Sequence, residues 1–339
     1  MNAAVKILTA VLLTFAAPAM AQTRTASLLV EAETGRVLFS ENATEKRYPA
    51  SLTKMMTLYL VFDALEKGEI RMDQLFTVSK KAAGMPRSRM GLKENSTISV
   101  ENLIFAMISR SANDAAVVVA EGLAGSEAQF ADKMTRTARE LGMKNTRFKN
   151  ASGLHNRDQV TTAQDMAILS KALIQHFPKY YKLFSVRGFR YGRRYYGNHN
   201  LVARFYKGGD GLKTGYVDAA GYHVVGSAVR DGKRLIGVVM GRNSVRERDR
   251  HIFKLLDTGF AALKNKTAPV NTLDDAPLFA PAREQTADES EKQYRDRRIQ
   301  ARKLSESLDA IASLEQSLQT KEDGNVVKNA IIDWGRKRP

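Results

Sequence analysis

Apolar positions near both ends of the main segment follow strand patterns. Residues 26–39 hold two short apolar runs around a polar Glu-Thr-Gly string, which predicts a β-hairpin. Residues 223–229 and 235–240 are two further apolar runs, and Asp231-Gly232 between them predicts a tight turn. Both ends of this segment are therefore expected to supply strands.

The residues between these strands follow helical patterns. Apolar side chains recur at helical spacing from Ser51 to Glu66, directly after Pro49. Further helical patterns cover residues 100–109, 112–122, 127–141, 163–176 and 247–263. Residues 186–212 are rich in Gly, Arg and Tyr and predict turns and short strands. Strands that enclose a helical middle predict an α+β fold with one antiparallel sheet, flanking helices and a helical subdomain.

The N-terminus has the pattern of an export signal. Lys6 precedes an apolar run from Ile7 to Pro18, and Ala19-Met20-Ala21 ends it with small residues. This run is shorter than the about 20 residues that a transmembrane helix needs. We predict that residues 1–21 are a signal peptide, with an uncleaved anchor as the alternative. The mature chain is then expected to begin near Gln22 and to be exported, and anchoring in the membrane stays open.

The chain changes character after residue 265. Three prolines in residues 267–281 predict a linker over residues 266–283. Residues 284–320 are charged and favour a helix, in which five aliphatic residues recur every 3.5 positions on average: Leu304, Leu308, Ile311, Leu314 and Leu318. This stripe predicts either self-association through 304–318 or a helix that folds back onto the main domain. Residues 321–339 predict a flexible tail or a weakly amphipathic surface helix.

Composition and charge narrow the classes of function. The 339 residues include no cysteine, which excludes disulfides, thiolate metal sites and a cysteine nucleophile. The five histidines form no HxxxH or HExxH pair, so we expect no metal site and no cofactor. Of the net charge of +17, +16 lies on residues 22–265, because basic and acidic residues balance at 13 each afterwards. This charge predicts contact with an anionic envelope polymer or membrane surface, since an exported protein seldom meets nucleic acid.

Three short strings carry candidate chemistry. In Ser51-Leu52-Thr53-Lys54 a hydroxyl and an amine share one helix face, and a neutral lysine can serve a serine nucleophile as its base. In Ser111-Ala112-Asn113, a tight turn can point a hydroxyl and an amide into the same cleft. Lys213-Thr214-Gly215 combines a cation with a glycine that lets a ligand approach a strand. Each string alone also fits a structural role, as a helix cap or a charged edge strand.

The order of these strings, SxxK, SxN and KTG, resembles that of the D-alanyl-D-alanine carboxypeptidases, the low-molecular-mass penicillin-binding proteins. The resemblance runs from about Ala26 to Leu263. It includes the shorter strings Tyr48-Pro49-Ala50, Ser88-Arg89-Met90, Asn150-Ala151-Ser152-Gly153-Leu154, Thr161-Thr162-Ala163-Gln164-Asp165-Met166 and Asp210-Gly211-Leu212. It implies the fold shared by penicillin-binding proteins and β-lactamases, with a catalytic domain over residues 22–265 acting in the periplasm.

The resemblance implies acyl transfer at the D-Ala-D-Ala end of a peptidoglycan stem peptide, with β-lactams as inhibitors. Ser51 would form the acyl-enzyme, Lys54 would be the general base, and Ser111 would return a proton to the leaving amine. The residues implied to hold the peptide, its carboxylate and its oxyanion are Asn113, Lys213, Thr214, Gly215, Tyr216 and Arg248, with Arg246 as an alternative to Arg248.

The sequence departs from the family pattern in two places, and three alternative functions fit it. Asn198-His199-Asn200 stands where family members often carry Asn-Arg-Asn, and the family's second, β-rich domain is expected to be absent. An endopeptidase of cross-linked peptidoglycan would share all three strings. A β-lactamase would need a carboxylate that activates water, and Asp158 and Asp165 lie in a comparable region. The non-enzymatic alternative is a basic scaffold that binds the cell wall.

Overall fold

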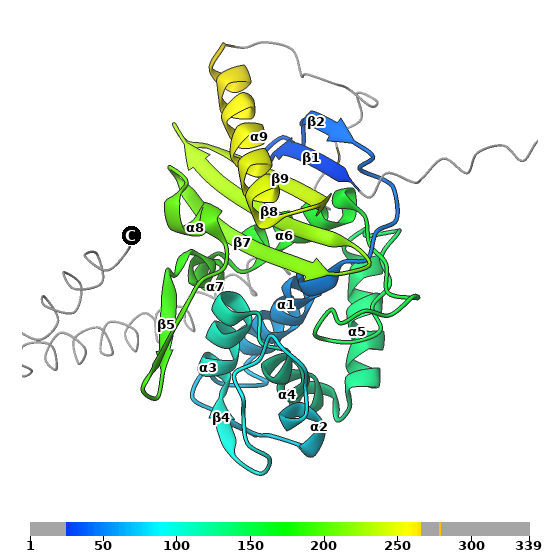
Figure 1. Cartoon of the computed structure of the whole chain (residues 1–339), viewed down its shortest axis with the longest axis vertical. Coiled ribbons are helices and arrows are strands. Elements are labelled where there is room, and N and C mark those ends of the chain that lie inside the picture. Colours follow the sequence, from blue (N-terminus) through cyan, green and yellow to red (C-terminus); the bar gives the residue numbers. More distant parts are fainter. Residues whose placement is uncertain (1–24, 266–277, 279–339) are drawn as a thin grey trace, which may run out of the picture. The chain divides into compact units, whose positions relative to one another are not determined.

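The computed structural model describes residues 25–265 and Leu278 (Figure 1). The domain predictions outside this part of the chain stay predictions: the signal peptide 1–21, the linker 266–283 apart from Leu278, the charged helix 284–320 and the tail 321–339.

One five-stranded antiparallel sheet is built from both ends of the described segment, as predicted. Its order is β2-β1-β9-β8-β7, and β7 is therefore an edge strand. The strands are β1 (Ala26–Glu31), β2 (Val37–Glu41), β7 (Gly209–Val217), β8 (Gly221–Arg230) and β9 (Lys233–Arg242). The first hairpin joins the last one where β1 pairs with β9, with Leu29 opposite Gly237. The predicted α+β architecture is confirmed.

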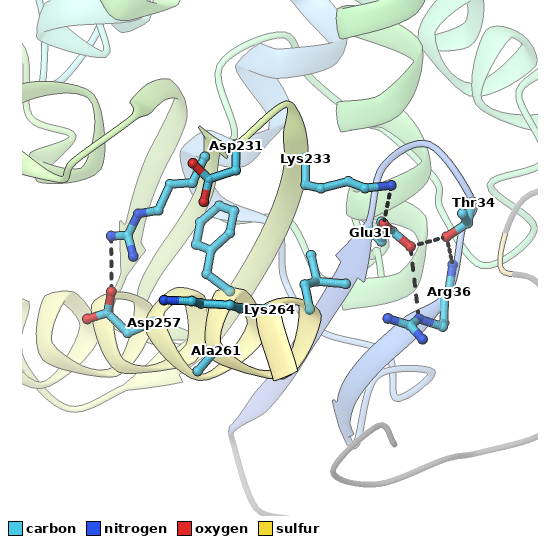
Figure 2. A pocket seen from close by; sticks show the side chains of 11 residues that line it. Glu31, Thr34, Arg36, Asp231, Lys233, Asp257, Ala261 and Lys264 are labelled. Carbon is cyan, nitrogen blue, oxygen red and sulfur yellow. Dashed lines mark hydrogen bonds and ion pairs between the residues drawn. The ribbon is translucent and has the colours of Figure 1, made fainter. Parts of the chain in front are cut away.

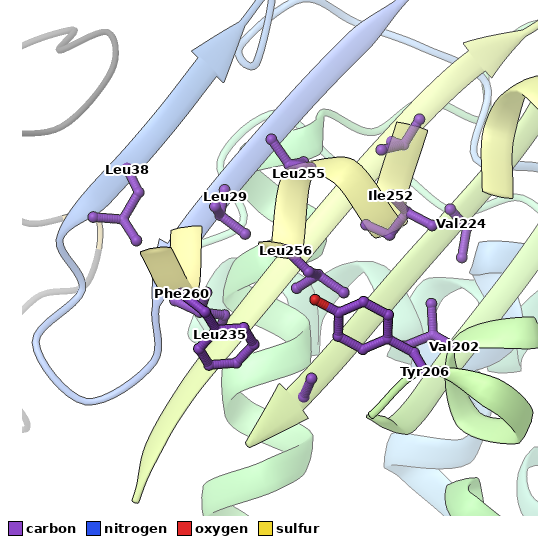
Figure 3. Close-up of a cluster of buried hydrophobic side chains, with 12 residues drawn as sticks. Leu29, Leu38, Val202, Tyr206, Val224, Leu235, Ile252, Leu255, Leu256 and Phe260 are labelled. Carbon is purple, nitrogen blue, oxygen red and sulfur yellow. The ribbon is translucent and has the colours of Figure 1, made fainter. Parts of the chain in front are cut away.

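Helix α9 (Val245–Asn265) covers one face of the sheet (Figure 3). Its apolar stripe, with Ile252 and Leu256 fully buried, packs on Leu29 of β1 and on Leu235 of β9. A Cβ atom at Gly259 would lie 2.4 Å from Leu29, so the glycine lets the helix lie close against the strands. Burial of this amphipathic stripe provides the main stabilisation of the contact.

Helix α6 (Ala163–His176) lies against the other face of the sheet, and most of the remaining helices form the helical subdomain. Its centre is α1 (Thr53–Glu66), in which every residue except Asp63 and Glu66 is buried. The other helices are α2 (Lys80–Ala83), α3 (Val100–Phe105), α4 (Asn113–Ala124), α5 (Glu127–Glu140) and α7 (Pro178–Tyr181). None of the helices within residues 25–265 is long and apolar enough to cross a bilayer.

The structure departs from the sequence-based elements in three places. A 3-10 turn, Ala50–Leu52, precedes α1, so Ser51 lies on this turn rather than in the helix. The predicted helix 100–109 ends as a π-helical turn, Ala106–Arg110. Residues 186–212 contain the hairpin of β5 (Gly188–Tyr191) and β6 (Arg194–Gly197) and also a short helix, α8 (Leu201–Phe205). Short elements of this kind are formed by tertiary packing and leave little periodicity in a sequence.

Two further short strands complete the helical subdomain. They are β3 (Leu75–Thr77) and β4 (Thr97–Ser99), and they pair with each other as a two-stranded antiparallel sheet.

Candidate active site

The three strings meet at the edge of the sheet. A cleft of about 420 Å³ lies between β7 and the helical subdomain. Among the residues that line it are Ser51, Ser111, Asn113, Thr214, Gly215, Tyr216 and Arg248. Lys54 and Lys213 are buried, with 0% and 1% of their surfaces exposed. Seven of the nine residues predicted for the site therefore line one cleft although their segments lie far apart in sequence, and Lys54 and Lys213 are buried next to residues that line it.

Gly215 brings β7 against the turn that carries Ser51. A Cβ atom at Gly215 would lie 3.1 Å from the Ser51 nitrogen and 3.3 Å from the Leu52 nitrogen. The backbone N–H groups of this turn and of the edge strand β7 are thus close together, as an oxyanion hole requires. Gly153 supports the turn from the other side, because a Cβ atom there would lie 1.9 Å from the Ala50 carbonyl oxygen.

A Gly215→Ala substitution is expected to slow acylation of Ser51 by about 10- to 100-fold with little loss of folding stability, because a shift of a few tenths of an ångström misaligns the oxyanion donors. The second-order rate constant for covalent penicillin labelling measures this effect. Gly197→Ala is a matched control, since a Cβ atom there meets nothing within 4 Å. Equal labelling rates for the Gly215 variant and wild type would contradict the proposed role of this close approach.

Lys54 has the surroundings of a neutral amine. Its Nζ lies 2.8 Å from Asn113 Oδ1, 2.5 Å from the Ser152 carbonyl oxygen and 3.4 Å from Ser51 Oγ. Burial, together with the charge of Lys213, holds the pKa of Lys54 well below its usual value. A neutral amine has two protons, and the two oxygen acceptors use both of them. Its lone pair is then left for the Ser51 hydroxyl proton, which is the arrangement of a general base.

Lys213 supplies the second buried nitrogen. Its Nζ donates a hydrogen bond of 2.8 Å to the Thr214 carbonyl oxygen. Burial and the neighbouring charge of Arg248 lower the pKa of Lys213 to about 7. Lys213 can therefore carry a charge in neutral solution, and this charge favours the neutral form of Lys54 and attracts anions into the cleft.

Ser111 and Asn113 occupy a tight turn, as predicted. Ser111 has the left-handed backbone angle φ +58°, which is uncommon for a residue other than glycine, and its buried Oγ has no hydrogen-bond partner among the described residues. Asn113 accepts from Lys54 and donates to the Pro86 carbonyl oxygen over 3.0 Å. The alternative role as a helix cap does not apply, because the capping residue of α4 is Ala112 and no side chain caps this helix.

Two basic side chains at the cleft differ in charge. Arg248 is buried in the wall and forms a two-pronged contact with Asp249, with bonds of 2.8 and 2.9 Å. Its alternative, Arg246, is exposed and does not line the cleft. His199 lines the cleft, and partial desolvation together with nearby cations lowers its pKa to about 4. The imidazole is therefore neutral at pH 7, where the family pattern would place a second arginine.

Three supporting residues were not assigned roles from the sequence. His223 is buried, accepts from the Gly241 N–H over 2.9 Å and donates to the Tyr48 carbonyl oxygen over 3.0 Å, and so ties the peptide before Ser51 to the sheet. Asp114 accepts from three N–H groups of residues 90–92. Ser152 lies in a string that the resemblance had singled out, but only the fold shows its contact with Lys54.

A larger hollow, of about 820 Å³, lies between the C-terminal end of α9 and the turns β1–β2 and β8–β9 (Figure 2). Its charged groups pair with one another, Lys233 with Glu31 at 3.4 Å and Arg230 with Asp257 at 3.0 Å. The one hydroxyl that lines it, on Thr34, donates over 2.6 Å to the Glu31 carboxylate, which Lys233 and Arg36 already neutralise, whereas the Ser51–Lys54 pair lies at the smaller cleft. Within residues 25–265, no group of three or more His, Asp or Glu side chains could hold a metal ion.

Comparisons with known proteins agree with this geometry. A sequence family described as D-alanyl-D-alanine carboxypeptidase matches residues 14–244. The D-alanyl-D-alanine carboxypeptidase DacF of Bacillus subtilis is 38% identical over 240 residues, which cover 69% of this chain and 61% of DacF. The chain thus spans about three fifths of the length of this relative.

Solved structures show the same fold. Penicillin binding protein 5 of Haemophilus influenzae superposes with a TM-score of 0.68 at 36% identity, over 70% of each chain. Penicillin-binding protein D2 of Listeria monocytogenes, in a cefotaxime-bound form, superposes with a TM-score of 0.64 at 33% identity, over 70% of this chain and 98% of that one. On its sequence, its fold and the meeting of its three motifs in one cleft, this chain belongs to the family of D-alanyl-D-alanine carboxypeptidases.

Proposed function

We propose that this protein is a serine-type D-Ala-D-Ala carboxypeptidase that removes the terminal D-alanine from peptidoglycan stem peptides. The observation that carries the proposal is the buried Lys54 amine, whose lone pair is left for Ser51 at the floor of the cleft. The relatives are named for the same activity. We expect β-lactams to be inhibitors. The solved structure of the Listeria monocytogenes relative contains one such compound, cefotaxime.

In the proposed reaction, Ser51 Oγ attacks the carbonyl carbon between the two D-alanines while Lys54 takes the hydroxyl proton. The N–H groups of Ser51 and Tyr216 hold the oxyanion, and each such donor is typically worth about 3 kcal/mol. The tetrahedral intermediate collapses when the amide C–N bond breaks, and the proton passes from Lys54 through Ser111 to the leaving amine. Water then attacks the acyl-enzyme, Lys54 again acts as the base, and Ser51 regains its proton.

The proposed substrate contacts follow the charges of the cleft. Arg248 and the Thr214 hydroxyl, which line the cleft, would hold the terminal carboxylate, and the charged form of the buried Lys213 would add positive potential. The pairing of Arg248 with Asp249 reduces the net attraction of Arg248 for an anion, so the charge of Lys213 matters more for the potential in the cleft. Asn113 can still donate to a substrate carbonyl, because its bond to Pro86 uses one of its two amide protons. Gly215 allows the peptide to lie along β7.

The structure argues against two of the alternatives. No aspartate or glutamate lines the cleft, and a β-lactamase of the expected kind would need one to activate water. Asp165 instead accepts from Thr146 Oγ1 and the Asn145 N–H, and Asp158 is exposed outside the cleft. A scaffold without turnover would not need two buried lysines, whose desolvation costs folding free energy. An endopeptidase would use the same groups, so substrate length separates it from a carboxypeptidase.

The test is mass spectrometry of two substrates after incubation with the full chain: a pentapeptide that ends in D-Ala-D-Ala, and a cross-linked peptide dimer. We expect loss of one alanine from the pentapeptide and a slower or absent reaction of the dimer. Cleavage of the dimer alone would identify an endopeptidase. No reaction with either substrate would support the scaffold.

We also propose that the protein acts in the periplasm. The support is the export pattern of residues 1–21 and the peptidoglycan substrate inferred above. Contact of the basic surface with the wall or the membrane, and self-association through 304–318, remain predictions.

A further inference from the structure

A long stretch of the described chain that contains basic but no acidic residues lies beside the cleft. No acidic residue occurs between Asp165 and Asp210, and this stretch contains nine lysines and arginines. Four of them are exposed on or next to the β5–β6 hairpin and form no ion pair with another described residue: Arg187, Arg190, Arg193 and Arg194. Unpaired exposed charges of one sign attract an anionic partner.

The two faces of this hairpin differ. On the inner face, the rings of Phe189 and Tyr196 stack at 5.5 Å, and Phe189 stacks on Phe105 of α3 at 5.9 Å. On the outer face, Arg190 lies directly opposite Tyr195 in the strand register. Because cross-strand partners share a face, the outer face presents a guanidinium and a phenol side by side. The inner stacking holds the hairpin against the helical subdomain, beside which it projects (Figure 1).

Tyr195 forms a flat, open platform. Its side chain is folded back over Gly188, where a Cβ atom would lie 2.5 Å from the phenol oxygen, and the residue is 60% exposed. Glycine thus leaves room for the ring to lie along the strand. Exposed aromatic rings next to arginines are the composition that binding surfaces favour over the rest of a protein surface.

The hairpin is joined to the wall of the cleft. β6 ends at Gly197, and His199, two residues later, lines the cleft. The base is closed by the Asn198 N–H, which donates to the Arg187 carbonyl oxygen over 2.8 Å. On the inner face, the guanidinium of Arg110, the residue before Ser111, lies 6.0 Å from the Tyr196 ring. The hairpin therefore adjoins the wall of the cleft, within reach of a polymer whose end is bound there.

We propose that the β5–β6 hairpin is an accessory binding surface for the peptidoglycan polymer, outside the cleft in which the bond is cut. This inference rests on the proposed function. The arginines would bind carboxylates of the peptide stems, and the Tyr195 ring would pack against the apolar faces of the sugars. Since a cleft of about 420 Å³ holds little more than a peptide end, contacts to the rest of the polymer need such a surface.

The test compares two variants of equal charge in the Ser51→Ala background. The hairpin variant carries Arg190→Gln, Arg193→Gln and Arg194→Gln. The control carries Lys80→Gln, Lys93→Gln and Lys144→Gln, three exposed lysines of the helical subdomain without ion pairs to described residues. Binding is measured by co-sedimentation with purified insoluble peptidoglycan at low and at physiological salt, and with vesicles of phosphatidylglycerol.

We expect the hairpin variant to bind peptidoglycan about tenfold more weakly and with a smaller salt dependence, since three exposed charge contacts are lost. The control should stay within about twofold of the parent. In the active background, kcat/KM for a short soluble pentapeptide should change less than about twofold, because the hairpin lies outside the reacting site. Tyr195→Ala should weaken binding of the polymer without changing its salt dependence.

Three outcomes would overturn the inference. Equal losses in both variants would indicate a general effect of net charge. Unchanged binding of peptidoglycan would remove the hairpin from the interaction, and a loss confined to the vesicles would identify lipid headgroups as its ligand. Because binding is measured without turnover, a wild type that leaves the pentapeptide intact would refute the proposed activity and not the polymer-binding surface.

Discussion

A Ser51→Ala protein is expected to take no covalent label from a fluorescent penicillin and to cleave the D-Ala-D-Ala pentapeptide at least about 10⁴-fold more slowly than wild type. The substitution removes the attacking oxygen and leaves the backbone N–H groups of the turn in place. Residual binding of the peptide should therefore persist while acyl transfer stops. Gel fluorescence after labelling and mass spectrometry of the intact protein measure the two effects.

Ser40→Ala is the matched control for this experiment. Ser40 begins the only other Ser-x-Asn string of the sequence, Ser40-Glu41-Asn42, but it lies on β2 and does not line the cleft. Full labelling of the Ser40 variant is expected. A labelled Ser51→Ala protein would place the nucleophile elsewhere and would refute the acyl-enzyme on Ser51.

A Lys54→Met protein is expected to acylate about 10³-fold more slowly, because the general base is lost while the apolar stem of the side chain is kept. Met55 and Met56 already lie buried in α1, so a methionine suits this environment. The penicillin acylation rate measures the loss, and Lys67→Met on an exposed turn is the control. An unchanged rate would mean that another group takes the Ser51 proton.

The lowered pKa values of the two lysines predict the pH profile of the wild type. Lys54 must be neutral, so kcat/KM should fall as acid protonates it below its lowered pKa. Lys213 must be charged, so kcat/KM for a peptide carboxylate should also fall as pH rises through about 7, the pKa of Lys213 in the free protein. A profile that rises steadily from pH 7 to pH 10 would contradict the charged role of Lys213, and a profile without a fall in acid would contradict Lys54 as the base.

The same lowered pKa values determine in which direction the stability of the folded protein changes with pH. A lysine whose pKa is lowered by folding releases its proton when the chain folds, so the unfolded state binds more protons between the lowered pKa and about 10.4. The free energy of unfolding of the wild type therefore rises with pH in this window. Lys54→Met has lost one such group, and its stability should rise less steeply. Parallel pH dependences would indicate that Lys54 keeps its proton in the folded protein.

Local hydrophobic patterns in the sequence predicted the regular helices and strands. Strands β1, β8 and β9 are nearly continuous apolar runs because helices cover both faces of the sheet, and α9 has helical periodicity because it buries one stripe. Both hairpins and α9 were found where predicted. The 3-10 turn at Ser51 and helix α8 were not predicted. Their conformations are set by neighbours, such as the close approach of Gly215 to the turn, that lie far away in sequence.

The amino-acid sequence alone determined the set of reactive groups: a serine and a lysine one turn apart, a second serine with its asparagine, and a lysine beside a glycine on a strand. These follow from short-range spacing, which a linear pattern records. Only the tertiary structure shows that Lys54 has the surroundings of a neutral amine, because these depend on burial, on contacts with Asn113 and Ser152, and on the charge of Lys213. Desolvation and Coulomb interaction act through space, so no spacing along the chain can express them.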